Sequence, residues 1–340
     1  MAEKRFSNLD LAKQVDAFPY EDTEPEAYQA MMAAANLYTL TWKDGTPLGY
    51  MLPTVVDELE QVPLAIRGPV AIDRAARTVH AFEAGATEAE RTRAVAAVMG
   101  HWRERGTFEV LRRGWRGELW PVYGSGAEVL YSAERAGMGL LGATGYGVHM
   151  TAYVRDDEDG DGGMRIWVPR RAADKQTYPG MLDNAAAGGL MTGEEPFECL
   201  VREADEEADL PADLVRRRAR AAGTVSYVYV ARDGKRMAGG GGPPGQIYPE
   251  SQWVYDLELP RDVRPRPKDG EVAGFELLGV AEVKEALARG EFKPNCALVT
   301  LDFFVRHGIL TRENEPDYDE IVRRMHRRLP FPGPHQVAAA

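Results

Sequence analysis

The most unusual stretch of the chain is an acidic segment of sixteen residues, 194–209. It carries eight carboxylates and one base, Arg202, so its charge is 1 − 8 = −7 within a net charge of 41 − 53 = −12. At about 100° per residue, helical spacing places Glu203, Glu206 and Glu207 on one face. Such carboxylates repel one another unless something positive lies between them, and Mg²⁺ or Mn²⁺ prefers oxygen ligands. The spacing therefore allows a metal site. The alternative is a solvated acidic face, which is what most charge runs are.

The same segment has the pattern of an amphipathic helix. Pro196 suits a first helical position, and Glu198 is expected to reach back to the free N–H groups of the first turn. Apolar residues recur at helical spacing and predict the buried face: Phe197, Leu200, Val201, Ala204 and Ala208.

A longer pattern surrounds the three carboxylates. Gly188 is followed after five residues by Glu194, and after seven more by Arg202-Glu203, with Glu206-Glu207 beyond. This pattern resembles the signature of the Nudix hydrolases: Gly, five residues, Glu, seven residues, then Arg-Glu-aliphatic-any-Glu-Glu-any-Gly-aliphatic. Every fixed position matches except the last glycine, which here is Asp209.

The resemblance implies a loop–helix–loop that binds Mg²⁺ or Mn²⁺ and positions a diphosphate for hydrolysis. By this resemblance the metal ligands are Glu203, Glu206, Glu207 and the backbone carbonyl of Gly188. Arg202 and Glu194 would brace the loop and orient the acids. Asp209 replaces a glycine that ends the helix in a left-handed conformation, which Asp tolerates better than most residues. We expect this replacement to cost a little stability and to leave the catalytic geometry intact.

Segments outside this box extend the resemblance to roughly residues 5–333. They include Pro47–Leu52, Trp167–Arg171, Tyr178–Gly180, Leu182–Asn184, Pro294–Ala297 and Leu329–Gly333. Together they look like a fungal and plant Nudix subfamily that is labelled thiamine pyrophosphokinase-related and carries a second, N-terminal domain. Its members are similar to hydrolases that remove one phosphate from thiamine diphosphate and from its oxidised, damaged forms. The thiamine substrate is implied by the resemblance alone.

A general base outside the helix often assists in this superfamily. Glu271 is the candidate because it lies in the loop before an expected strand, Gly274–Val280, although it could equally be an ordinary surface glutamate. Glu250 is the reserve. Two other functions remain open: a Nudix hydrolase acting on an isoprenoid or nucleoside diphosphate derivative, and a module that binds a diphosphate without cleaving it.

Other polar and aromatic residues have simpler interpretations. His149 is expected to be a satisfied strand histidine rather than a pocket residue. The arginines at 216–218 and 220 are expected to form a solvated face that offsets the acidic helix. Trp115, Trp120, Tyr123 and Tyr146 could stack on a flat ring, but core packing is the favoured interpretation. The glycine-rich segment 142–147 is interpreted as a flexible connection, and Ala231–Gln246 as a long loop.

The surrounding elements predict an α/β fold: a Nudix α/β/α sandwich with a mixed β-sheet, preceded by a smaller α+β N-terminal domain. We expect domains at residues 1–145 and 146–333, followed by a tail at 334–340. In the second half, strands at Val148–Val154 and Met164–Val168 precede the box, and helices at Ala281–Ala288 and Cys296–Val305 follow it.

Composition limits the class of protein. The 44% hydrophobic and 28% charged content is ordinary for a globular protein, and no apolar run approaches the roughly 20 residues of a membrane helix. A net charge of −12 argues against nucleic-acid binding. Two cysteines are too few for a disulfide framework, and the first residues show no secretory signal, so a cytoplasmic location is expected. The expected partner is a small organic diphosphate, with no nucleic acid and no membrane.

Overall fold

The computed structural model describes residues 5–155, 163–175, 177–231 and 245–337. The Ala231–Gln246 loop expected from the sequence therefore lies largely outside the described residues. The chain groups into two compact units whose segments alternate along the sequence. Unit 1 comprises Met1–Asp16, Tyr146–Tyr227 and Ser251–Arg327, and unit 2 comprises Ala17–Gly145, Val228–Glu250 and Arg328–Ala340. This grouping differs from a linear division at residue 145. Residues 1–16 belong to unit 1, and residues 228–250 and 328–340 belong to unit 2.

Unit 1 is built on a six-stranded sheet with the order β10-β11-β7-β8-β12, in which β9 also pairs with β7. Its strands are β7 (Gly145–Arg155), β8 (Met164–Arg171), β9 (Ala186–Gly189), β10 (Ala219–Val230), β11 (Ile247–Glu258) and β12 (Val272–Gly279). β9 pairs with the first half of β7, at residues 147–150, and β8 pairs with the second half, at 152–155. The two strands thus share one edge of β7.

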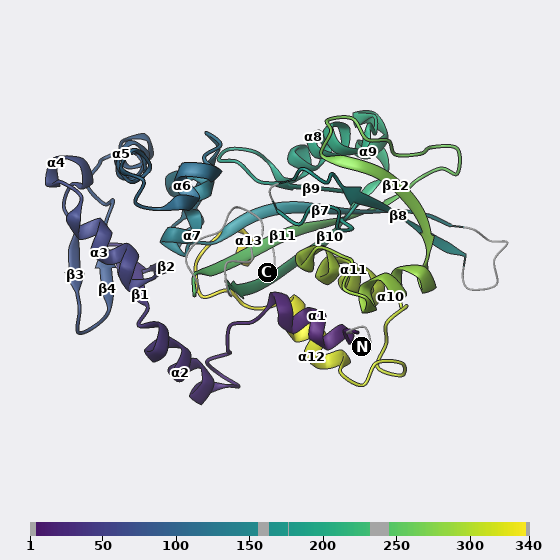
Figure 1. Cartoon of the computed structure of the whole chain (residues 1–340), viewed down its shortest axis with the longest axis horizontal. Helices are drawn as coiled ribbons and strands as arrows, with labels where there is room; N and C mark the ends of the chain where they lie inside the picture. The colour runs from purple at the N-terminus through teal and green to yellow at the C-terminus, as the bar shows by residue number, and fades with distance from the viewer. Residues whose placement is uncertain (1–4, 156–162, 176, 232–244, 338–340) are drawn as a thin grey trace. The chain divides into compact units, whose positions relative to one another are not determined.

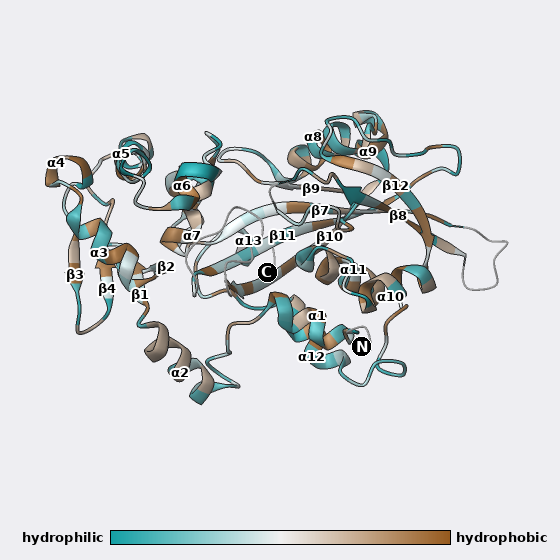
Figure 2. Cartoon of the chain, viewed as in Figure 1, coloured by the Kyte–Doolittle hydropathy of each residue, from teal (hydrophilic) through white to brown (hydrophobic). Residues whose placement is uncertain are grey.

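Helices cover both faces of this sheet. They are α1 (Asn8–Val15), α8 (Pro196–Ala208), α9 (Ala212–Arg218), α10 (Val280–Ala288), α11 (Pro294–Arg306) and α12 (Tyr318–Met325). Figure 1 shows α8 and α9 on one face, and α1, α10, α11 and α12 on the other. Hydrophilic and hydrophobic residues lie side by side along α1 (Figure 2), as expected for a helix with one buried face. The three-layer α/β/α arrangement predicted from the sequence is confirmed.

Unit 2 is an α+β assembly whose sheets have fewer strands than the sheet of unit 1. Its strands are β1 (Tyr38–Thr41), β2 (Pro47–Met51), β3 (Ala71–Asp73), β4 (Thr78–His80), β5 (Leu119–Tyr123) and β6 (Val129–Glu134). Its helices are α2 (Pro25–Ala35), α3 (Pro53–Gln61), α4 (Leu64–Arg67), α5 (Glu88–Arg105), α6 (Glu109–Gly114), α7 (Met138–Leu141) and α13 (Pro334–Val337). A mixed sheet has the order β2-β1-β4-β3, with β1 parallel to β4, and β5 pairs with β6 alone.

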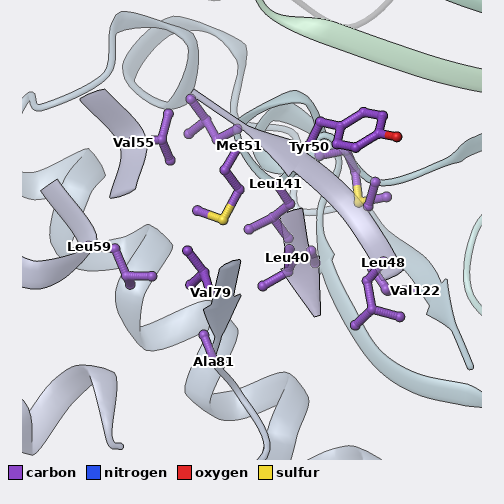
Figure 3. Close-up of a cluster of buried hydrophobic side chains, with 14 of the residues drawn as sticks. Leu40, Leu48, Tyr50, Met51, Val55, Leu59, Val79, Ala81, Val122 and Leu141 are labelled. Carbon is purple, nitrogen blue, oxygen red and sulfur yellow. The ribbon is translucent and has the colours of Figure 1, made fainter. Parts of the chain in front are cut away.

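A continuous apolar core holds unit 2 together. Figure 3 shows Val55 and Leu59 of α3 near Leu40 of β1 and Val79 of β4, and all four side chains are fully buried. Burial of each such side chain contributes roughly 1.5–3 kcal/mol to folding.

The glycine-rich segment before unit 1 is not a flexible connection, contrary to the sequence interpretation. Residues 136–150 are all buried. Gly142 has φ +60°, and a Cβ there would lie 1.9 Å from the carbonyl oxygen of Tyr50. A Cβ on Gly49 would lie 2.3 Å from the carbonyl oxygen of Leu141. Glycine is therefore required because two backbones touch, which makes this segment one of the most tightly packed parts of the chain.

Candidate functional site

A short loop, held by hydrogen bonds between Met191 and Glu194, connects β9 to the acidic helix α8. The backbone N–H of Glu194 donates to the carbonyl of Met191 (3.1 Å), and the N–H of Met191 donates to the Glu194 carboxylate (3.4 Å). The helix begins at Pro196 and buries Cys199, Leu200, Val201, Ala204 and Ala208. Phe197 is only partly buried and packs on Tyr255. The predicted buried face is thus largely correct, with Cys199 as an addition.

Arg202 is the hub of the charge network on this helix. Its Nε and Nη2 donate to the two oxygens of Glu194, at 2.8 and 3.2 Å. Its Nη1 donates to Glu203 (2.7 Å) and to Glu206 (3.0 Å). Burial favours the neutral acid in Glu194, but the hydrogen bonds and charge of Arg202 outweigh this and hold its pKa below the usual value. One guanidinium therefore ties the loop to the helix and neutralises two of the three expected metal ligands.

Gly188 supplies the space that Glu203 needs. A Cβ at this position would lie 2.0 Å from Oε1 and 2.1 Å from Cδ of Glu203. No side chain larger than hydrogen can be accommodated unless the carboxylate moves. The backbone of β9 at Gly188 is thus in contact with the Glu203 carboxylate of α8.

Glu207 has a different environment from the other two acids. Its carboxylate accepts a hydrogen bond from the backbone N–H of Ala187 on β9 (2.9 Å). Burial raises its pKa well above the ordinary value, and the charges of Glu203, Asp183 and Glu271 add to the increase. A cation between these groups would remove the repulsion.

The left-handed backbone expected at Asp209, the end of α8, is confirmed. This residue is left-handed, at φ 53° and ψ 36°, and its N–H bonds back to the carbonyls of Ala204 and Asp205. The following loop is held against the helix end, since the N–H of Arg266 donates to the carbonyl of Ala208 (2.9 Å) and Lys268 pairs with Asp205 (2.6 Å). Glu271 follows three residues after Lys268.

Glu271 lies where its sequence position suggested, directly before β12. Its carbonyl accepts the N–H of Ala172, at the end of β8, and its carboxylate pairs with Lys175. Its charge contributes to the raised pKa of Glu207 in the carboxylate cluster of α8. Glu250 is a buried residue of β11 in unit 2, beside Trp120 and Gly145.

A buried polar network beside this cluster was missed by the sequence reasoning. Asp183 accepts hydrogen bonds from Arg171 (2.7 Å), the Cys296 thiol (2.6 Å) and its neighbour's backbone N–H. Burial would raise its pKa, but the positive charges of Lys293 and Arg171 hold it far below the usual value. The motif segments containing these residues are about 110 residues apart, so only the fold could show that they meet.

His149 is buried, with Nδ1 2.8 Å from Oδ1 of Asn184, as expected for a satisfied strand histidine. Glu198 does not cap its own helix, because it pairs with Arg216 of α9 instead. The arginine face predicted to offset the acidic helix is thus confirmed at this residue. Arginines cover one face of each of two candidate stacking rings: Arg103 lies over Trp115 and Arg135 over Trp120.

Comparison with known proteins agrees with the box geometry. A family described as NUDIX domain matches residues 145–296, and a domain of unknown function (DUF4743) matches residues 36–145. An uncharacterized yeast protein, YJR142W of Saccharomyces cerevisiae, is 36% identical over 328 residues, covering 96% of this chain and 92% of its own length. The chain contains a Nudix domain at residues 145–296. It is accordingly a hydrolase of the class that acts on diphosphate-containing substrates.

Two plant Nudix proteins are also similar. Nudix hydrolases 20 and 24 of Arabidopsis thaliana, both named as chloroplastic, are each 38% identical over 70% and 69% of this chain. The matched part covers 59% of the length of each plant protein. Within the described residues of this Nudix chain, no helix is long and apolar enough to span a membrane.

The Nudix box has suitable chemistry for a divalent cation. Carboxylates and a backbone carbonyl are hard oxygen donors, and Glu207 is a partly buried acid whose neighbours are also acids. In the part of the chain that the structure describes, no three acidic, histidine or cysteine side chains are already gathered as a ligand set. The reason is visible in the contacts: Glu203 and Glu206 both point at Arg202.

Proposed function

We propose that this chain hydrolyses small organic diphosphates to a monophosphate and inorganic phosphate, with thiamine diphosphate and its oxidised analogues, oxo- and oxythiamine diphosphate, as preferred substrates. The Nudix domain and the similarity to plant Nudix hydrolases support the reaction class. The thiamine preference, and the role of removing damaged cofactor, are supported only by the whole-chain resemblance to the thiamine pyrophosphokinase-related Nudix subfamily. A cytoplasmic location is part of the same proposal.

The proposed metal is Mg²⁺ or Mn²⁺, held by Glu203, Glu206, Glu207 and the carbonyl of Gly188. When bound, such an ion supplies positive charge for the phosphoryl oxygens and makes water more acidic. Arg202 and Glu194 position the ligands, because their two-point ion pair fixes the loop relative to the helix.

The reaction needs a proton acceptor as well as charge. In the proposed step a water oxygen attacks the terminal phosphorus, the anhydride P–O bond breaks, and the organic monophosphate leaves with the bond's electron pair. The water's proton passes to the carboxylate of Glu271, which Lys175 holds in place. Glu250 is the alternative acceptor.

The observation that carries the proposal is the fit of Glu203 over Gly188, with Arg202 bridging Glu203 to Glu194. A phosphate-release assay with Mg²⁺ tests it. Glu206→Gln should lower turnover by about a hundredfold or more while the fold survives, since one ligand is lost and the buried face of α8 is untouched. Asp205→Asn is the matched control, because Asp205 is an acid of the same helix that pairs with Lys268. Equal activity in Glu206→Gln and the unmodified protein would refute the ligand assignment, and a chain inactive on every diphosphate would favour the non-catalytic binding module.

The substrate requires a separate experiment. kcat/KM should be compared for oxo- and oxythiamine diphosphate, thiamine diphosphate, ADP-ribose and isopentenyl diphosphate. We expect the oxidised thiamine compounds to be the best substrates; one polar or steric contact is worth a few kcal/mol, which is enough for this discrimination. A preference of tenfold or more for ADP-ribose or the isoprenoid would remove the thiamine assignment and leave the Nudix reaction standing.

A further inference from the structure

Lys293 is a buried lysine of unit 1 that has no acidic partner. It lies directly before α11 and is 7% exposed, so nearly all of the residue is enclosed while a small part still meets solvent. Among the described lysines and arginines, Arg324 and Arg327 are similarly buried, and both pair with Asp16. The ammonium of Lys293 forms no hydrogen bond or ion pair with any described residue. A buried charge without a partner destabilises a fold, which makes Lys293 a candidate for binding an anion.

Other donors lie next to Lys293 in the first turn of α11. The first N–H groups of this helix, those of Asn295 and Cys296, have no acceptor inside the helix. Asn295 is 2% exposed, and its Nδ2 donates to no described residue, while its Oδ1 lies 3.5 Å from the Cys296 thiol. The positive end of the helix dipole adds to the charge of the ammonium. The beginning of α11 therefore has the donors that a bound anion requires.

Asp183 is the acid that contacts this turn, and it is satisfied by other donors. Its carboxylate accepts hydrogen bonds from the Cys296 thiol, from Arg171 and from the backbone N–H of Asn184. Burial would raise the pKa of Asp183, and the charge of Lys293 lowers it although no hydrogen bond joins the two groups. The ammonium of Lys293 therefore keeps its three donors for another acceptor.

A single stretch of chain connects Lys293 with the Nudix box inside unit 1. The backbone N–H of Lys293 donates to the carbonyl of Leu182 (2.8 Å). Further along the same stretch, the N–H of Ala187 donates to the carboxylate of Glu207 (2.9 Å). Burial raises the pKa of Glu207, and the charge of Asp183, which lies between these two positions, adds to the increase. Residues 182–187 therefore contact both Lys293 and the box helix α8.

We propose that Lys293 and the first turn of α11 bind phosphate oxygens of the diphosphate substrate. This role rests on the hydrolysis proposed above and assigns substrate binding to residues outside the box. A lysine ammonium is a compact charge that binds phosphate, and the first N–H groups of a helix add further donors. The carboxylates of the box attract a cation but repel phosphate, so a basic group on the same stretch of chain supplies the attraction that they lack.

Isothermal titration with methylenediphosphonate in Mg²⁺ tests the proposal, because the P–C–P bridge of this molecule resists hydrolysis. We expect saturable binding to the full chain, weakened about tenfold or more in Lys293→Met, which removes the charge and keeps a side chain of similar length. Lys293→Gln is a second variant with the same expected direction, and its amide can still form hydrogen bonds if the buried site does not accept a thioether. Lys284→Met is the matched control, because Lys284 is an exposed lysine of α10 in the same unit and the change in charge is the same. This control should bind methylenediphosphonate as the unmodified chain does.

A double-mutant cycle separates binding by Lys293 from an effect through Asp183. We expect the loss of about tenfold to persist when Lys293→Met is made in an Asp183→Asn background. If Lys293 were only a counter-charge for Asp183, the loss would disappear once the acid is removed, and that result would overturn the proposal. Phosphate release by the unmodified chain tests the reaction independently. A chain that hydrolyses diphosphates but binds methylenediphosphonate equally well with Lys293→Met overturns only the role of Lys293, whereas a chain that neither binds methylenediphosphonate nor hydrolyses any diphosphate overturns both proposals.

Discussion

Replacing Gly188 by alanine tests whether the contact between β9 and α8 sets the position of Glu203. The added Cβ would lie 2.0 Å from Oε1, 2.1 Å from Cδ and 2.5 Å from Cγ of Glu203. Contacts under 3 Å do not persist, so the carboxylate must swing away. Its hydrogen bond to Nη1 of Arg202, 2.7 Å in the present structure, would then be lost.

The size of the effect follows from two terms. Overpacking costs about 1–3 kcal/mol, and a hydrogen bond between charged groups contributes about 1.5–3 kcal/mol when buried. The second term is reduced here because the Arg202 side chain is 32% exposed and water replaces part of the interaction. We therefore expect Gly188→Ala to destabilise the chain by about 1–3 kcal/mol and to lower kcat more than tenfold, since a proposed ligand is displaced.

A double-mutant cycle in urea isolates the cause. Glu203→Ala removes the carboxylate that the new methyl group would strike, so in that background Gly188→Ala should cost less than about 0.5 kcal/mol. Gly274→Ala on β12 is the matched control, because a Cβ there meets nothing within 4 Å. If Gly188→Ala costs as much without Glu203 as with it, the steric explanation is wrong.

Three further predictions concern the metal, the helix end and pH. Millimolar Mg²⁺ should raise the melting temperature, because it relieves repulsion around Glu207 and binds only the folded chain; an equal rise in Glu207→Gln would contradict this. Asp209→Gly should stabilise the chain by up to about 1 kcal/mol, measured in urea, since the residue is left-handed at φ 53°; a loss of stability would show that its side chain matters more than its backbone. Burial lowers the pKa of His149 to about 4. Between about pH 6.5 and 4 its imidazole is therefore neutral in the folded chain, whereas the same imidazole takes up a proton in the unfolded chain. Stability should therefore fall between about pH 6.5 and 4, by at most about 3 kcal/mol, and His149→Gln should remove this part of the pH profile in melting experiments; an unchanged profile would exclude His149 as its source.

The box helix could be predicted because its signals are local. A proline start, an apolar stripe and a left-handed end all lie within fifteen residues, and the structure has the helix at Pro196–Ala208 with Asp209 at its end. The hairpin strands of β5 and β6 were not predicted, since Pro121 interrupts the pattern of the first strand.

What the sequence could not provide are contacts between distant segments. Cys296 and Asp183 meet across 113 positions, and nothing in either local pattern links them. The error at Gly142 has the same origin, because a glycine that permits close packing and one that permits motion look identical in a sequence. Likewise, the partner of Glu198 lies on the next helix and not in its own first turn.

The alternation of the two units along the chain has a consequence for biosynthesis. The chain passes from one unit to the other after Asp16, Gly145, Tyr227, Glu250 and Arg327, so each unit contains segments that are far apart in the sequence. A ribosome must therefore reach about residue 327 before either unit has all its strands and helices, and contacts of such long sequence separation form slowly. A stop codon shortly before Arg327 should thus leave both units incomplete, and a nascent chain of this kind depends on chaperones for longer than one whose domains are consecutive.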